Sequence, residues 1–153
     1  MPRVQRSADV TWEGSVARGH GAISAATGTF ASLPYSLASR VERPDGKTSP
    51  EELLAAAHAG CYAMSLAGEL TAAGSPPEHL DVTATVTLDQ IEDGSHRIVA
   101  SDIVAQARVP GIDSTELQRV ADVADRGCTF SALIKASGRV TVQAILQGGT
   151  DGD

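Results

Sequence analysis

The feature that most constrains the fold is one long run of small and apolar residues with clear start and stop signals. Ser49 can cap a helix, Pro50 suits the first helical position, and Glu52 follows the cap by three residues, as in a capping box. The segment Gly74-Ser75-Pro76-Pro77 ends the pattern. The sequence therefore predicts a helix from Ser49 to about Ala72.

This predicted helix is apolar or small on both of its sides. One side carries Leu53, Ala56, Gly60, Ala63, Ala67 and Leu70, and the other carries Leu54, Ala57, Cys61 and Met64. A helix that is apolar all round is buried all round. The 153 residues include 24 alanines but only five aromatic residues, so the core has little bulk with which to cover it. Burial of this helix therefore requires a large sheet or a second chain.

The rest of the chain predicts strands and two further helices. The predicted strands are two within 9–25, joined by a turn near Arg18–Gly21, and one each over 35–41, 82–88, 96–109 and 139–146. The further predicted helices cover 114–127 and 128–136. No repeat or linker is visible, so we expect an α+β class, a single domain over 1–147 and a disordered tail over 148–153.

Charge and hydropathy exclude several kinds of partner. The formal net charge is −7, and no stripe of Lys and Arg is present, which argues against nucleic acid and against an anionic membrane surface. The residues after Met1 contain no apolar leader. The segment Leu53–Gly68, which is free of acidic, Lys and Arg side chains, is too short and too rich in small residues to span a bilayer. We therefore expect a cytoplasmic protein that binds neither nucleic acid nor membrane.

Two motif-like patterns carry little weight. Gly46-Lys47-Thr48 resembles the end of a phosphate-binding loop, but Val41 stands where the leading glycine is required. His58 and Cys61 lie three residues apart on the predicted helix, and Cys128 could join them around a metal ion. No fourth ligand has a suitable spacing. A metal site is therefore kept only as a weaker alternative, and neither a metal nor a bound cofactor is expected.

The two cysteines pose the main functional question. Without an export signal a structural disulfide is disfavoured, so Cys61 and Cys128 are free or catalytic thiols. Burial raises the pKa of a thiol, so Cys61 needs a cation nearby to be reactive. Arg40, on the predicted strand over 35–41, is the candidate cation, and Glu51 in the first helical turn is its natural partner. The alternative is that both cysteines are inert core residues and that Arg40 and Glu51 form a structural pair.

The residues around both cysteines resemble a known family. The segment from Thr48 to Cys61 is similar to the central helix of the osmotically inducible protein C and organic hydroperoxide resistance proteins. Further similar segments are 102–104, 109–112, 127–128 and 131–133. The resemblance covers nearly the whole chain and is closer to the osmotically inducible protein C subgroup. The family usually has Pro after its second cysteine, where this chain has Thr129.

The resemblance implies a thiol-dependent peroxidase that reduces organic hydroperoxides to alcohols in oxidative or osmotic stress defence. Cys61 would be the peroxidatic thiolate, Cys128 the resolving thiol, Arg40 the activating cation and Glu51 its carboxylate partner. The resemblance also implies antiparallel sheets packed on buried central helices in an intertwined homodimer. Its sites would lie at the subunit interface, and an external dithiol of the lipoyl type would reduce it. The alternative is a non-enzymatic stress protein of the same fold that binds a small molecule.

Two tensions remain between this resemblance and the residues themselves. Cys128 begins a predicted helix, so the helix dipole favours it as the more acidic thiol, although the family assigns the attack to Cys61. In addition, Glu51 and Cys61 are ten residues apart, which is about 15 Å along a straight helix. Arg40 cannot contact both side chains across that distance. We therefore expect either a helix break near Gly60 or a contribution of Arg40 or Glu51 from the other subunit.

Overall fold

The computed structural model describes residues 3–148 and divides after Leu53 into two compact units. Each unit contains a three-stranded sheet. Such compact units need not be domains that fold independently, so the single domain expected over 1–147 stays a prediction. The tail expected over 148–153 lies, from residue 149 onward, outside the described residues.

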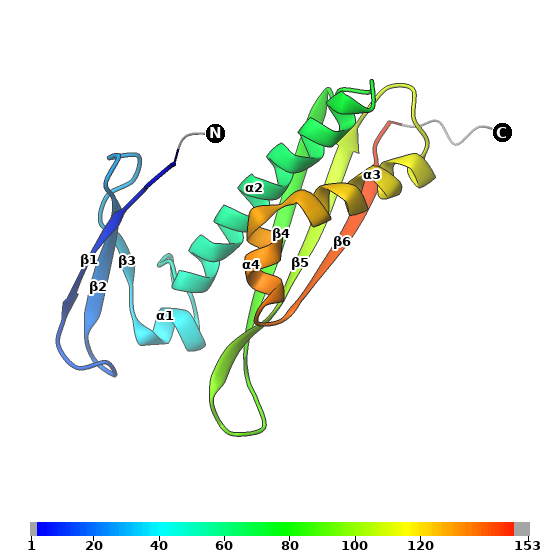
Figure 1. Ribbon diagram of the computed structural model, residues 1–153. Coiled ribbons are helices and arrows are strands. Elements are labelled where there is room, and N and C mark those ends of the chain that lie inside the picture. The colour runs from blue at the N-terminus through cyan, green and yellow to red at the C-terminus, as the bar shows by residue number, and fades with distance from the viewer. Residues whose placement is uncertain (1–2, 149–153) are drawn as a thin grey trace. The chain divides into compact units, whose positions relative to one another are not determined.

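The first unit contains a small antiparallel sheet in the order β1-β2-β3 (Figure 1). Its strands are β1 (Ala8–Glu13), β2 (His20–Ala25) and β3 (Leu33–Tyr35). The rings of Trp12 and Tyr35 lie 5.4 Å apart, on either side of Gly21. A Cβ at Gly21 would collide with both rings, so only glycine allows this close approach.

The strand predicted over 35–41 is wrong. Only Tyr35 belongs to a strand, and Leu37–Val41 form a short helix, α1. The side chain of Ser36 accepts the Ser39 N–H at 3.1 Å, and the side chain of Ser39 accepts the Ser36 N–H at 2.9 Å. These reciprocal bonds satisfy the backbone groups that a strand would have used in its ladder. Arg40 therefore lies in the last turn of a helix.

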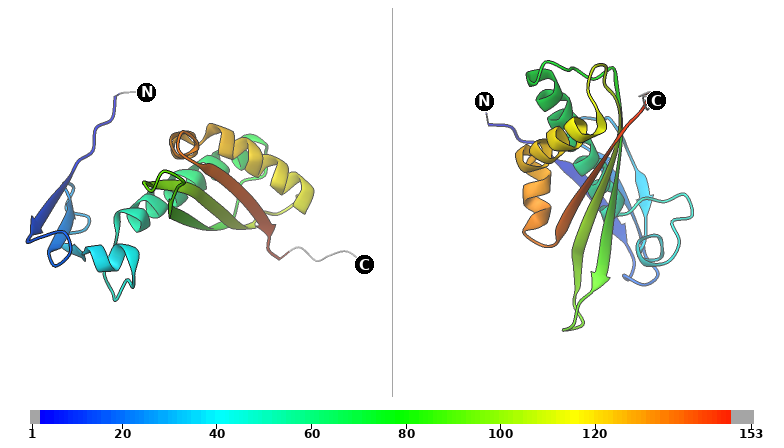
Figure 2. Two further views of the ribbon diagram at one scale, coloured as in Figure 1. Left: turned by 90° about the horizontal axis from the view of Figure 1, so that it is seen from below. Right: turned by 90° about the vertical axis from the view of Figure 1, so that its right-hand side faces the viewer.

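The second unit is built on a larger sheet in the order β4-β5-β6. Strands β4 (His79–Gln90) and β5 (His96–Arg108) are antiparallel, as predicted. Strand β6 (Arg139–Leu146) is parallel to β5, which the expectation of antiparallel sheets did not include. The reason is the long crossover through α3 (Ser114–Gly127) and α4 (Thr129–Lys135). Figure 2 shows these two helices on one side of the sheet.

Helix α2 (Pro50–Ala72) is continuous, and its residues from Leu54 onward belong to the second unit. Ser49 caps it by accepting the Glu52 N–H at 3.1 Å, as predicted. The carboxylate of Glu52 accepts from the Thr48 hydroxyl at 2.9 Å. Among the described residues, no helix combines the length and the apolar character needed to cross a bilayer.

One face of α2 packs in the core of the second unit. Tyr62, Leu66 and Leu70 are fully buried against β5 and α3, and the buried partners include Ile103, Ala105, Leu117 and Ala121. The opposite face, which we call the open stripe, consists of Ala56, Gly60, Met64 and Gly68 and is exposed. The prediction that α2 is buried all round is therefore wrong for a single chain. One sheet and two helices cover only one side of it.

Candidate thiol active site

The two cysteine sulfurs lie side by side although the residues are 67 positions apart in the sequence. Cys61 is in the middle of α2, and Cys128 is the single residue between α3 and α4. Both are free thiols, and Cys128 Sγ donates a hydrogen bond to Cys61 Sγ across 3.4 Å. A disulfide requires a further approach of only about 1.4 Å.

The surroundings of Cys61 lower its pKa. Burial raises the pKa of this thiol, but hydrogen bonds from the Phe130 N–H, the Thr129 hydroxyl, the Cys128 thiol and the Thr129 N–H outweigh burial. Two of these donors are amides in the first turn of α4, so the positive start of this helix faces Cys61. The expectation that Cys61 needs an arginine to become acidic is therefore too narrow. Helix α4 follows Cys128 in the sequence, but its first amides lower the pKa of Cys61.

Thr129 makes a contact that the usual proline of the family could not make. Its Oγ1 lies 3.6 Å from Cys61 Sγ, and its backbone N–H also lowers the pKa of Cys61. Proline has neither a hydroxyl nor a backbone N–H. The departure that the sequence flagged at Thr129 therefore adds two donors beside Cys61.

The two thiols differ in their access to solvent. Cys61 is partly exposed, whereas Cys128 is buried. Cys128 also caps α4, since its sulfur accepts the Ser131 N–H at 3.5 Å. A molecule from solvent can therefore reach the sulfur of Cys61, whereas the sulfur of Cys128 is buried next to it.

Arg40 and Glu51 form an ion pair within the first unit. Arg40 Nε and Nη2 both approach Glu51 Oε1, at 2.8 and 2.7 Å. The Glu51 side chain is only 13% exposed, and within the described part of the chain its Oε2 has no hydrogen-bond partner. Arg40 is 41% exposed and lines a hollow of about 210 Å³ together with Trp12, Val16, Tyr35 and Leu37.

The continuity of α2 excludes one of the two arrangements that the sequence allowed for Arg40. The helix does not break near Gly60, so that alternative is wrong. Glu51 and Cys61 of one chain are therefore about 15 Å apart along the axis. A contribution of the Arg40–Glu51 pair from another subunit is the alternative that stays a prediction.

A buried histidine is the group whose role sequence reasoning missed. His58 is fully buried, with Nδ1 2.6 Å from Ser101 Oγ and Nε2 2.8 Å from Ser131 Oγ. Burial lowers its pKa, with Asp125 opposing and Lys135 reinforcing the shift.

Both ring nitrogens of His58 are already engaged, and the described residues contain no cluster of three metal-binding side chains. The metal site considered for His58, Cys61 and Cys128 therefore has no free imidazole nitrogen. The matching spacings, His58 three residues before Cys61 and Ser131 three after Cys128, were the available signal.

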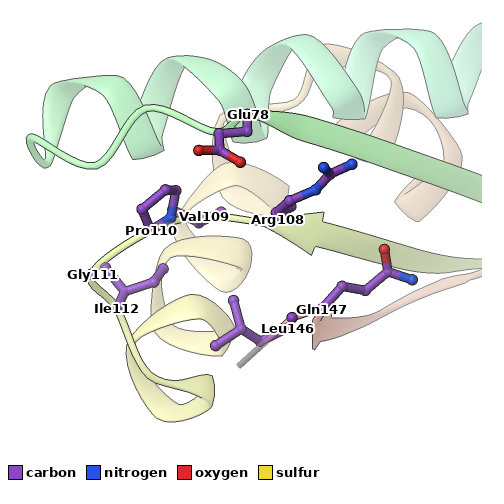
Figure 3. A pocket seen from close by; sticks show the side chains of 9 residues that line it. Glu78, Arg108, Val109, Pro110, Gly111, Ile112, Leu146 and Gln147 are labelled. Atoms are coloured by element: carbon purple, nitrogen blue, oxygen red, sulfur yellow. The ribbon is translucent and has the colours of Figure 1, made fainter. Parts of the chain in front are cut away.

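A second hollow lies in the second unit and is separate from the thiols. It has a volume of about 420 Å³ and is lined by Arg108, Pro110, Ile112 and Leu146 among others (Figure 3). Neither a cysteine nor a histidine lines it. It is therefore not part of the thiol site.

Comparison with known proteins identifies the family. Residues 43–143 match the family described as OsmC-like protein. The chain belongs to this family. Peroxiredoxin OsmC of Escherichia coli (strain K12) is 36% identical over 133 residues, which cover 87% of this chain and 92% of that protein. Peroxiredoxin OsmC of Shigella flexneri matches equally well.

Solved structures agree on the fold of this OsmC-like chain. The organic hydroperoxide resistance protein OsmC from Legionella pneumophila has a TM-score of 0.70 at 18% identity, covering 94% of this chain and 99% of that one. The organic hydroperoxide resistance protein OhrB of Bacillus subtilis has a TM-score of 0.68 at 24% identity, covering 92% and 98%. The resemblance and the α+β class are therefore confirmed. Glu51 and both cysteines fall inside the matched OsmC-like region, whereas Arg40 lies just before it.

Proposed function

We propose that this OsmC-like protein is a thiol peroxidase that reduces organic hydroperoxides to alcohols through Cys61 and Cys128. The observation that carries the proposal is the sulfur pair itself. A partly exposed cysteine with a lowered pKa has a second, buried thiol 3.4 Å away. The first property suits a nucleophile, and the second suits a resolving thiol. The curated relatives named peroxiredoxin support the same chemistry.

The proposed reaction balances with one external dithiol. The Cys61 thiolate attacks the terminal oxygen of ROOH, the O–O bond breaks, and the departing alkoxide takes up a proton to become ROH. Cys61 is then a sulfenic acid. The Cys128 sulfur attacks Cys61 Sγ, the S–O bond breaks, and the hydroxyl leaves as water with the Cys128 proton. A dithiol of the lipoyl type returns two electrons and two protons to the disulfide, so no bound cofactor is needed.

We further propose that the Arg40–Glu51 pair serves Cys61 of a second copy of the chain. The unbroken α2 keeps Glu51 about 15 Å from the cysteine of its own chain. The open stripe leaves an apolar face of α2 without cover, as expected for a surface that meets another copy. Glu51 Oε2 is buried and, among the described residues, still free to accept a further donor. These observations support an intertwined homodimer whose two sites are shared between subunits.

The preference for organic hydroperoxides has its own support. The hollow beside Arg40 is lined largely by the aromatic and aliphatic side chains of Trp12, Val16, Tyr35 and Leu37. Apolar walls favour an alkyl or aryl group over water, because its transfer out of water is favourable. In the proposed dimer such a group would be bound beside the guanidinium that faces the peroxide.

Stopped-flow measurement of cumene hydroperoxide consumption tests the proposal. The wild-type protein should consume peroxide, and Cys61→Ser should not. After one equivalent of peroxide, mass spectrometry should find the Cys61 and Cys128 peptides linked with the loss of two hydrogens. Undiminished consumption by Cys61→Ser would refute the assignment. Thiols that resist peroxide while a ligand co-purifies would favour the non-enzymatic binding protein.

A further inference from the structure

One buried histidine connects the two cysteine-bearing segments. His58 precedes Cys61 by three residues on α2, and Ser131 follows Cys128 by three residues on α4. The hydrogen bond between His58 Nε2 and Ser131 Oγ, 2.8 Å long, therefore joins α2 to α4 beside the sulfur pair. The other ring nitrogen is held by Ser101 Oγ of β5 at 2.6 Å. The imidazole is thus fixed at both ends.

The connection is fully enclosed by the protein. His58, Ser101 and Ser131 each have 0% exposure. A neutral imidazole has one donor and one acceptor nitrogen, so it can satisfy two serine hydroxyls at once. The lowered pKa of His58 agrees with this neutral form. A buried polar group that loses its partner costs free energy, so the three side chains hold one another in place.

The connection matters because α4 has little stability of its own. The helix has seven residues, and isolated helices of that length do not persist in water. Cys128 caps its first turn, and the sulfur accepts the Ser131 N–H at 3.5 Å. A tertiary anchor at Ser131 therefore also determines where Cys128 lies.

We propose that His58 is a positioning residue for disulfide closure, holding the start of α4 so that Cys128 stays within reach of Cys61. Its part in the reaction rests on the proposed peroxidase function. The positioning itself is a property of the thiol pair and is measurable without peroxide. Neither ring nitrogen of His58 contacts a cysteine sulfur, so the residue acts through Ser131.

Redox equilibration with glutathione tests the positioning directly. Oxidised glutathione plus the Cys61–Cys128 dithiol gives the protein disulfide plus two reduced glutathiones, and the equilibrium constant reports the effective concentration of the two thiols. His58→Leu and Ser131→Ala should each lower this constant about tenfold, which raises the reduction potential by about 30 mV. His58→Gln, whose amide also donates and accepts, should recover part of the loss.

Tyr62→Phe is the matched control. Tyr62 lies on the same helix and donates a buried hydrogen bond to the Ala121 carbonyl of α3 at 2.9 Å, so its hydroxyl is bound to α3 and not to Ser131. Its loss should leave the glutathione equilibrium unchanged even where it lowers stability. If the equilibrium constant fell equally in Tyr62→Phe and Ser131→Ala, the role of His58 would be structural and not specific to the thiol pair. Constants in His58→Leu and Ser131→Ala that match the wild type would overturn the proposal.

Single-turnover oxidation separates this inference from the proposed function. With cumene hydroperoxide, Ser131→Ala should form the Cys61 sulfenic acid at the wild-type rate but close the disulfide about tenfold more slowly, so that dimedone traps the intermediate. If wild-type Cys61 does not react with peroxide, the proposed function fails, and the glutathione equilibrium still decides the positioning. If His58→Leu does not fold, Ser131→Ala alone decides it.

Discussion

Cys128 donates its thiol hydrogen to the sulfur of Cys61 across 3.4 Å, bringing the middle of α2 to the start of α4. The direction of this bond makes Cys61 the acceptor of the pair. It agrees with the amides of α4 that also face Cys61 and with the partial exposure of that residue. These three features support Cys61 as the proposed nucleophile. From the sequence alone, the helix dipole favours Cys128 as the more acidic thiol.

Thr129→Val should raise the pKa of Cys61. The substitution keeps the shape of the side chain but removes the hydroxyl 3.6 Å from the sulfur. Thr129→Pro should raise the pKa further, because it also removes a backbone N–H. The midpoint of iodoacetamide alkylation against pH measures both effects. Thr115→Val, at an exposed threonine of α3, is the control, and a midpoint that does not move in Thr129→Val would show that the hydroxyl does not stabilise the thiolate.

Arg40→Ala should also raise the pKa of Cys61 and slow its oxidation by cumene hydroperoxide about a hundredfold, the usual loss for one preorganised charged donor.

In the proposed dimer the arginine and the cysteine come from different chains. Equal amounts of Arg40→Ala and Cys61→Ser chains, refolded together, should therefore recover about a quarter of the sites, because half of the dimers are mixed and each has one intact site. No recovery would mean that the pair does not act across subunits.

Met64→Glu should dissociate the proposed dimer without unfolding the chain. Met64 is 78% exposed at the centre of the open stripe, so a carboxylate is harmless in one chain but costly in an apolar interface. Sedimentation velocity should show a monomer, and peroxide consumption should fall with it. Glu92→Lys, in the exposed turn between β4 and β5, should sediment as the wild type does. A Met64→Glu protein with unchanged sedimentation would place any interface elsewhere.

The buried histidine should make folding stability depend on pH. The pKa of His58 is lowered in the folded chain, so below its ordinary value of about 6.5 the unfolded chain binds the extra proton first. The stabilising contribution is fully present above pH 6.5 and is lost as the pH falls toward the folded pKa. The slope for one proton is at most about 1.4 kcal/mol per pH unit. Urea titrations from pH 5 to 8 should show this slope in the wild type and a flatter one in His58→Gln.

Much of the secondary structure was predictable because its signals are local. The cap at Ser49, the alternation along β4 and the stop near Gly127 act within a few residues, and all three features are present. The strand expected to hold Arg40 failed for an equally local reason. Ser36 and Ser39 cap each other across three residues, and this serine pair was not recognised in the sequence.

The sequence by itself determined the long helix α2, the class of the fold and the two cysteines that make thiol chemistry available. Only the tertiary structure decided which sulfur faces the amides of α4, and that His58 bonds two serines that lie 43 and 73 residues away. Capping and periodicity arise between neighbours along the chain. Hydrogen bonds to a buried sulfur or imidazole depend instead on how distant segments pack, and that is specified by the whole core at once.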